Sequence, residues 1–346
     1  MTFPMTMNSN ICVIGYFGYV DNQLDGQTIK TREIYNLIKN NTESKLTYID
    51  TQELRKKPYL LLSFIIKVRK ADVIVYLPGR NNLTKLFKWI WRFKKKRTKI
   101  IYPVVGGWLA EFINGNHELI SRLSTFELIG VETNSLKKKL ETEYDFKNVE
   151  VLPNFRAINY QPKPNENQEG LKMAFMARVT ETKGCDIIFS IAEKIRENSI
   201  KDISIGFYGN IDSEYKDRFF SQLSKYGDIC RYGGLVEPEK VYEVLNDYDV
   251  LLLPTYYEGE GFPGSITDAY KAGIPVMVSE WKDIPEFVDH GQSGFVVKDN
   301  NADSYYELIK LLYDDKTKLT EMKKRAFAKS HEYSAEKSWE IIKKYL

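Results

Sequence analysis

Residues 254–297 read PTYYEGEGFPGSITDAYKAGIPVMVSEWKDIPEFVDHGQSGFVV. An apolar run that ends at Pro254 predicts a strand, and a glycine-rich loop then leads into Ile266–Lys271, which has helical spacing. The short apolar runs Pro275–Val278 and Gly294–Val297 predict two more strands. Strands that alternate with helices in this way are typical of a parallel sheet in an α/β domain.

The same alternation extends over most of the chain. Apolar runs predict further strands at Ile11–Ile14, Leu46–Ile49, Val73–Leu77, Lys99–Tyr102, Phe126–Val131, Val149–Leu152, Leu171–Ala177, Ile203–Tyr208 and Val250–Pro254. Helical spacing predicts helices at Thr28–Lys39, Leu54–Lys70, Gly184–Arg196 and Pro238–Asn246, and roughly 301–346 is expected to be helical throughout.

A polar break divides this pattern into two halves. Its sequence, QPKPNENQEG at 161–170, is rich in Pro and Asn and has no periodicity. We therefore expect an N-terminal domain at 1–155, a linker at 156–170, a second domain at 171–330 and a C-terminal helix at 331–346 that crosses back to the first. The expected fold class is α/β, with two doubly wound, Rossmann-like domains facing a central cleft, where ligands bind outside the carboxyl ends of the strands.

Composition excludes several classes of protein. The chain has 346 residues, of which 43% are apolar and 28% charged, which suits two globular domains and excludes collagen, coiled coil and wholesale disorder. Its apolar runs are too short to span a membrane, and its first residues lack the pattern of a signal peptide. The three cysteines, Cys12, Cys185 and Cys230, lie far apart, which favours a reduced cytosolic protein.

Motifs for several common chemistries are missing from the sequence. It contains no P-loop, no GxGxxG after the first strand, no GxSxG and no HExxH. Three histidines are too few for a His-rich metal site, and Asp247 and Asp249 fall at the end of an expected helix. We therefore expect no metal site.

Two loops of the second half carry residues suited to a phosphorylated sugar. In MARVTETKGCD (176–186), Arg178 and Lys183 flank a turn between a strand and a helix, where two cations can hold a diphosphate. Glu260 and Asp268 bracket a glycine-rich turn, so that carboxylates can accept sugar hydroxyls while backbone amides reach phosphate oxygens. The structural alternative is a plain turn with solvated cations and a helix-start acid at Asp268.

The order and spacing of these residues resemble glycosyltransferase family 4, which has the GT-B fold. That family shows R-x4-KG followed by EGFG or EGFP and a second acid, E-x7-E; here the residues are Arg178, Lys183, Gly184, Glu260 and Asp268, with Asp where the family has Glu. The match is strongest over 171–297. In the N-terminal half, residues 15–38 resemble the family's first loop and helix, and residues 104–113 its acceptor-side loop.

The resemblance implies a role for each matched residue. Arg178 and Lys183 neutralise the leaving diphosphate, and Glu260 faces hydroxyls of the transferred sugar. The backbone at Gly261 and Phe262 contacts phosphate or sugar.

Two further roles concern the nucleotide, and one family feature is missing. Asp268 holds the nucleotide ribose, and the loop 15–26 closes over the phosphates, with Gly26 as the closest approach. The family is generally retaining and needs no bound metal. The histidine that many members place near the acceptor has no clear counterpart, since His117 lies downstream of the Gly106–Gly107 loop.

Charge and aromatic residues also point to a membrane surface. Residues 1–155 carry 24 basic and 15 acidic residues, a net charge of +9, against −6 for 156–346. In KLFKWIWRFKKKRTK (85–99), eight residues are basic and none is acidic. We expect one face of this helix to pack on the core and the remaining aromatic and basic residues to contact an anionic membrane. The core face consists of Leu86, Trp89, Ile90 and Phe93. The five residues predicted to bind the membrane are Phe87, Lys88, Trp91, Arg92 and Lys95. A solvated core helix and, ranked lower, a nucleic-acid site are the alternatives.

The expected activity is retaining transfer of a hexose from a nucleotide-diphosphate sugar, with UDP-sugars favoured, to a saccharide or lipid-linked acceptor in cell-surface polysaccharide synthesis. We expect no cofactor, no nucleic-acid partner and a cytoplasmic location on the inner face of the membrane. Two alternatives stay open: a nucleotide-sugar epimerase or phosphorylase-like enzyme of the same fold, and a non-catalytic subunit that docks another transferase to the membrane.

Overall fold

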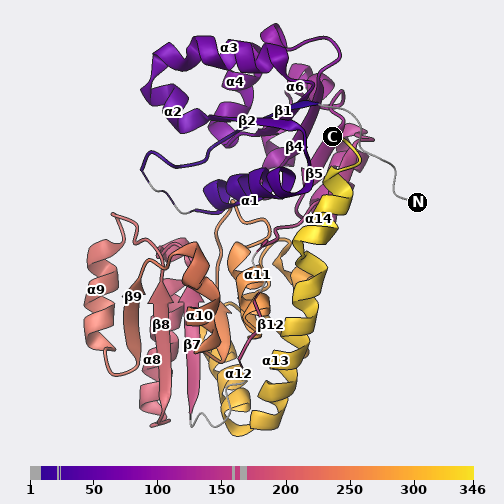
Figure 1. Cartoon of the computed structure of the whole chain (residues 1–346). Helices are drawn as coiled ribbons and strands as arrows, with labels where there is room; N and C mark the ends of the chain where they lie inside the picture. The colour runs from indigo at the N-terminus through magenta and orange to yellow at the C-terminus, as the bar shows by residue number, and fades with distance from the viewer. Residues whose placement is uncertain (1–8, 22, 24, 158–159, 164–169) are drawn as a thin grey trace. The chain divides into compact units, whose positions relative to one another are not determined.

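The computed structural model describes residues 9–346 apart from 22, 24, 158–159 and 164–169. The chain forms two compact units (Figure 1). Unit 1 comprises Met1–Ala157 and Ser334–Leu346, and unit 2 comprises Ile158–Tyr333. Both are Rossmann-like α/β units built on a parallel sheet, which confirms the predicted fold class. Much of the predicted linker, at 158–159 and 164–169, lies outside the described residues.

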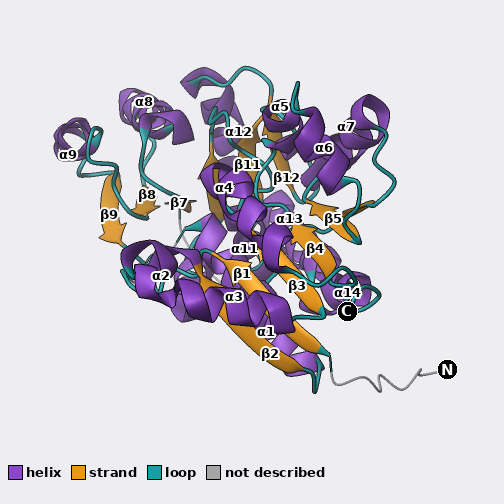
Figure 2. Cartoon of the chain, turned by 90° about the horizontal axis from the view of Figure 1, so that it is seen from above, coloured by secondary structure: helices purple, strands orange, loops and turns teal. Residues whose placement is uncertain are grey.

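Unit 1 contains a parallel sheet with the order β2-β1-β3-β4-β5-β6, whose strands run side by side in Figure 2. Its strands are β1 (Asn10–Gly15), β2 (Lys45–Asp50), β3 (Val73–Leu77), β4 (Lys99–Pro103), β5 (Leu128–Val131) and β6 (Val149–Val151). Its helices are α1 (Gly26–Asn41), α2 (Thr51–Lys56), α3 (Leu61–Lys70), α4 (Arg80–Phe93), α5 (Leu109–Ile113), α6 (His117–Leu123), α7 (Asn134–Tyr144) and α14 (Ala335–Ile342).

Side chains of β1 alternate between two hydrophobic cores, because neighbouring residues of a strand point to opposite faces of a sheet. Cys12 and Ile14 join the core that α3 and α4 cover, whereas Ile11 and Val13 join the core that α1 and α14 cover. The last helix of the chain therefore packs within unit 1, although unit 2 precedes it in the sequence. Burial on both faces of the sheet explains why its inner strands β1 and β3 are continuous apolar runs.

Unit 2 contains a parallel sheet with the order β12-β11-β10-β7-β8-β9. Its strands are β7 (Leu171–Met176), β8 (Ile203–Tyr208), β9 (Cys230–Gly234), β10 (Val250–Leu253), β11 (Val276–Ser279) and β12 (Gly294–Val297). Its helices are α8 (Cys185–Glu197), α9 (Lys216–Lys225), α10 (Val241–Asn246), α11 (Gly264–Lys271), α12 (Ala302–Asp314) and α13 (Lys316–Ser330). The chain runs outward from β7 to β9 and returns to β10 on the other side of β7. Sheets of this kind bind ligands where the order reverses, beside the carboxyl ends of the strands.

Two predicted elements differ from the structure. The helix expected at Leu54–Lys70 is divided into α2, a 3₁₀ turn at Pro58–Leu60 and α3. Pro58 has no amide hydrogen and disfavours helical geometry in the residue before it, so it ends the first helix. The strand β9 was not predicted, because its sequence CRYGG has no apolar run; it forms at the edge of the sheet.

The predicted orientation of α4 is wrong for Phe87 and Trp89, although Ile90 is buried and Leu86 and Phe93 pack against the core as predicted. Phe87 was assigned to a membrane, but it is 2% exposed and packs in the core against Tyr76 and Phe126. Trp89 was assigned to the core, but it is 46% exposed. The helix begins at Arg80, and the buried stripe also contains Leu83, which a helical wheel drawn from residue 85 leaves out.

The other four residues predicted to bind the membrane differ in their exposure and contacts. Lys88 and Arg92 are exposed, so a role at a membrane stays a prediction for them. Trp91 is half-buried, and Lys94 and Arg122 lie over its ring. Lys95 forms an ion pair of 2.9 Å with Asp72. Across the described part of the chain, no helix has both the length and the apolar character that crossing a bilayer requires.

Candidate active site

The candidate site of unit 2 lies where β7 and β10 end. These strands are parallel neighbours, with Leu251 of β10 opposite Ala174 of β7. The loop after β7 carries Arg178 and Lys183, and the loop after β10 carries Glu260. Because both strands point the same way, the two loops emerge at one edge of the sheet, where the strand order reverses.

Lys183 and Glu260 form a nearly buried ion pair. The Nζ of Lys183 lies 2.5 Å from Oε2 of Glu260, and the two side chains are 12% and 8% exposed. The hydroxyl of the buried Thr255 donates to the same carboxylate oxygen over 2.9 Å. Buried pairs add little net stability, because the loss of water offsets the attraction between the charges. The pair is therefore better explained by what it holds in place at the edge of the sheet than by stability.

Tyr257 brings the two predicted cations onto one aromatic ring. The Nζ of Lys183 lies 4.9 Å from the ring centroid, and Cζ of Arg178 lies 5.6 Å from it. The backbone carbonyl of Tyr257 accepts a hydrogen bond of 2.9 Å from Nε1 of Trp281. The ring face attracts cations, so it gathers two positive charges at the end of the sheet. Neither Tyr257 nor Thr255 was predicted as a site residue, although both lie within residues 254–297.

Gly184 explains why a glycine follows Lys183. Its φ of +83° is left-handed, and a Cβ at this position would lie 2.2 Å from the carbonyl oxygen of Pro254. The loop after β7 is thus pressed against the end of β10, which leaves no room for a side chain. Thr180 supports the same turn, because its hydroxyl accepts a hydrogen bond of 3.3 Å from the amide of Lys183.

Phe262 anchors the glycine-rich loop to the core of unit 2. Its ring is buried and stacks on Phe287 with centroids 3.7 Å apart and planes at 8°. The side chain therefore belongs to the core, and the contact of the Gly261 and Phe262 backbone with phosphate or sugar that the resemblance implies stays a prediction. The loop ends at Gly264, where α11 begins.

The two remaining predicted residues lie on separate helices. Asp268 is the fifth residue of α11, about one turn into the helix, and is 8% exposed. Gly26 is the first residue of α1 in unit 1; it is exposed, and a Cβ added there would meet no atom within 4 Å. Asp25 caps this helix through a hydrogen bond of 2.9 Å from the amide of Thr28. The proposed roles of Asp268 and Gly26 stay predictions.

A second charged cluster, which was not predicted from the sequence, joins α1 to the loop at Val104 and Gly106 in unit 1. Nζ of Lys30, on α1, lies 2.7 Å from Oε1 of Glu132, and both side chains are almost fully buried. Lys30 also donates to the carbonyl of Val104 over 3.1 Å, and Glu132 accepts the amide of Gly106 over 3.1 Å. Burial lowers the pKa of Lys30, an effect that Glu132 opposes. This pair ties the α1 segment to the Gly106 loop, the two regions that resemble the family's N-terminal half.

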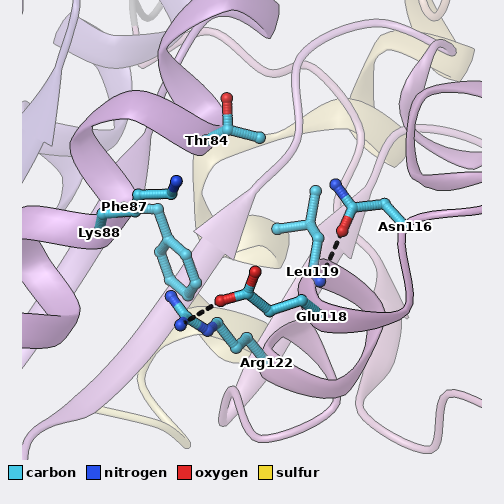
Figure 3. Close-up of a pocket in the computed structure, with 7 residues that line it drawn as sticks. All are labelled: Thr84, Phe87, Lys88, Asn116, Glu118, Leu119 and Arg122. Carbon is cyan, nitrogen blue, oxygen red and sulfur yellow. Dashed lines mark hydrogen bonds and ion pairs between the residues drawn. The ribbon is translucent and has the colours of Figure 1, made fainter.

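A small pocket in unit 1 lies between α4 and α6 (Figure 3). Thr84, Phe87 and Lys88 line one side, and Glu118, which pairs with Arg122, lines the other. Its volume is about 140 Å³, whereas small-molecule sites typically enclose roughly 300–1,000 Å³. It is therefore too small to compete with the unit 2 site for a nucleotide sugar. Among the described residues, no group of three or more His, Cys, Asp or Glu is placed to hold a metal ion.

Comparison with known proteins identifies the family. The family described as Glycosyl transferases group 1 matches residues 157–329, which is half of the chain. Over 140 residues the chain is 29% identical to WcaL of Salmonella typhimurium, provisionally named a colanic acid biosynthesis glycosyltransferase. Over 144 residues it is 26% identical to the amylovoran biosynthesis glycosyltransferase AmsK of Erwinia amylovora. These matches cover 38% and 40% of this chain and 33% and 35% of the relatives, so the chain spans about a third of their length.

Solved structures agree on the fold. Anabaena HepE in complex with UDP and glucose superposes with a TM-score of 0.73 over 97% of this chain and 98% of its own, at 13% identity. Identity at this level shows a shared fold and nothing finer. The family match covers unit 2, which contains the paired Lys183 and Glu260. The protein belongs to the group 1 glycosyl transferases.

Proposed function

We propose that the protein is a retaining, family 4 glycosyltransferase that moves a hexose from a nucleotide-diphosphate sugar to a saccharide or lipid-linked acceptor. The observation that carries this proposal is the cluster in which Glu260 and Tyr257 hold Lys183, with Arg178 on the same ring. Two cations held by one loop suit the diphosphate of a nucleotide sugar. UDP-sugars are the favoured donors, since HepE was solved with UDP and glucose.

Each part of the donor has a proposed partner in unit 2. Arg178 and Lys183 take the diphosphate, with help from backbone amides at Gly261 and Phe262. Glu260 is already fixed by Thr255 and Lys183, so one of its oxygens can accept a sugar hydroxyl without first giving up all its partners. Asp268 takes the ribose hydroxyls from its place on α11.

The proposed chemistry follows from charge development. The bond between the anomeric carbon and the diphosphate oxygen breaks, which places negative charge on the diphosphate and positive character on the sugar ring. The acceptor oxygen bonds to the same face of the anomeric carbon, and its proton passes to the departing phosphate. The fixed charges of Arg178 and Lys183 stabilise the leaving group without rearrangement, and such preorganised charge accounts for much of the rate enhancement in many enzymes. We propose that these two side chains neutralise the diphosphate without a divalent cation.

A lipid-linked acceptor is the favoured class. A relative from Campylobacter jejuni, 30% identical over 93 residues that cover 27% of this chain and 24% of the relative, is named as an N-acetylgalactosaminyltransferase acting on a diphospho-undecaprenol sugar. The AmsK and WcaL names point to extracellular polysaccharides. We propose the same setting for this chain, with unit 1 receiving the acceptor at the cytoplasmic face of the membrane.

Calorimetry with UDP, GDP and ADP and their hexose derivatives tests the donor site. We expect one nucleotide to bind in the presence of EDTA, and Lys183→Ala to abolish that binding. Lys310→Ala is the matched control, because Lys310 is an exposed lysine on α12 of the same unit. The absence of binding to any nucleotide by the folded protein would overturn the proposal. Conversion of a bound UDP-hexose to its epimer without an acceptor would assign an epimerase instead.

A further inference from the structure

The positive charge of this protein is concentrated in one segment of unit 1. Residues 51–100 contain 15 Lys or Arg and two acidic residues, a net charge of +13, whereas the rest of the chain carries −10. Both acids are already paired, Glu53 with Lys57 and Asp72 with Lys95, each at 2.9 Å. The segment forms α2, α3, β3 and α4. Most of its Lys and Arg side chains are exposed, so the surplus positive charge faces solvent and favours an anionic partner.

The same segment exposes large apolar side chains. Tyr59, Leu62 and Ile66 are 74%, 68% and 45% exposed, and we call these three residues the α3 patch. Leu62 and Ile66 lie four residues apart, so they share one side of α3. The opposite side holds Phe64 and Val68, which are buried in the core. The α3 patch is therefore an outer face, and the helix runs along the margin of unit 1 (Figure 1).

Basic residues flank the α3 patch on both ends of the helix. Three precede Tyr59 and three occupy the last turn of α3; they are Arg55, Lys56, Lys57, Lys67, Arg69 and Lys70. Besides the paired Lys57, two of them are partly engaged, since Lys56 pairs with Asp21 and Lys67 donates to the carbonyl of Tyr48. Arg69 and Lys70 are exposed, as are Lys88 and Arg92 of α4, which packs against α3.

We infer that the α3 patch docks unit 1 on a membrane surface that contains anionic lipid. Exposed apolar residues surrounded by Lys and Arg characterise helices that lie in the headgroup region, where the apolar side enters the boundary of the acyl chains and the cations meet lipid phosphates. Charge complementarity selects this partner over a neutral one, because the segment carries +13. The inference moves the docking site from Phe87, which is buried, to α3.

The inference rests on the proposed function in one respect: a lipid-linked acceptor requires the enzyme at the bilayer. Its test is independent of catalysis. The full-length protein is mixed with vesicles of phosphatidylcholine alone or with an equal amount of phosphatidylglycerol, and the bound fraction is measured by flotation. The test variant is the double change Leu62→Ser and Ile66→Ser. Leu311→Ser is the matched control, since Leu311 is 41% exposed on α12 of unit 2.

The wild type and Leu311→Ser are expected to bind the anionic vesicles and not those of phosphatidylcholine alone. Their binding is expected to weaken as the salt concentration is raised. The double variant is expected to bind at least tenfold more weakly, while UDP binding by unit 2 is unchanged. Equal binding by the double variant would overturn the inference, and so would failure of the wild type to bind anionic vesicles. Self-association of the wild type that the double variant lacks, without vesicle binding, would assign the α3 patch to a protein interface instead. A wild type that binds anionic vesicles but no nucleotide would count against the proposed function alone.

Discussion

The buried pair of Lys30 and Glu132 makes a sharp prediction about stability. Glu132→Gln preserves the shape of the side chain and one acceptor for the amide of Gly106, but it leaves the charge of Lys30 in a site that is 3% exposed. Removing one partner of such a pair typically costs about 3–5 kcal/mol of unfolding free energy. Lys30→Met is expected to cost a similar amount, because the buried carboxylate of Glu132 then loses the cation that balances its charge. The double variant that combines Lys30→Met with Glu132→Gln removes both charges of the pair. It is expected to lose no more unfolding free energy than either single variant.

The loss of stability caused by Glu132→Gln is expected to depend on pH in a defined direction. Burial already lowers the pKa of Lys30, and removing Glu132 removes the charge that opposes the lowering. The unfolded chain then binds more protons than the folded one, so stability rises with pH, and the loss is expected to be smaller at about pH 9 than at about pH 6.

Urea unfolding followed by tryptophan fluorescence measures these changes. Four of the five tryptophans lie in unit 1, at 89, 91, 108 and 339, so the signal reports mainly the unit that contains the pair. Leu311→Ser, in unit 2, is the control for a general effect of substitution. A loss below about 1 kcal/mol for Glu132→Gln, or a double variant as unstable as the two single losses added together, would refute the reasoning.

Three further predictions concern the donor site and acid stability. Lys183→Ala is expected to lower kcat/KM for the donor by about 10²–10³-fold in a donor hydrolysis assay, the usual effect of losing one preorganised contact to a leaving group; a change below tenfold would remove Lys183 from catalysis. Gly184→Ala is expected to lower the melting temperature and donor binding together, because its Cβ would collide with the carbonyl of Pro254; normal binding would show that the loop can shift. Asp72→Asn is expected to cost on the order of 1 kcal/mol at neutral pH, after allowance for solvent screening. Hydrogen bonds from Asn10 and Lys95 lower the pKa of Asp72 to about 2. The stability this carboxylate provides is present above about pH 4 and lost as pH falls through about 2, so wild type and variant should converge in acid urea titrations.

Local patterns in the chain predicted much of the fold. Within the described residues, apolar runs located every strand except β9, and the turn residues placed the loops after β7 and β10. Periodicity is a local property, so it can be interpreted without knowledge of the neighbours in space. It failed where the local signal was absent, at the glycine-rich edge strand Cys230–Gly234, and where Pro58 interrupted an otherwise helical pattern.

Local patterns could not predict which side chains contact each other. Lys183 and Glu260 were each proposed as binding residues, but their contact spans 77 positions and depends on β7 and β10 being neighbours. Tyr257 carries no spacing that marks it as the ring beneath two cations. Lys30 and Glu132 lie 102 positions apart, and a lysine on an expected helix is ordinarily solvated.

The sequence by itself determined the α/β class, the two-domain organisation and the loops that carry Arg178, Lys183 and Glu260, because alternating apolar runs and glycine-rich turns have local physical causes. Only the tertiary structure decided which faces are covered. It buried Phe87 and left Leu62 and Ile66 exposed, because burial depends on which elements pack together, and that is set by strand order rather than by the helix alone.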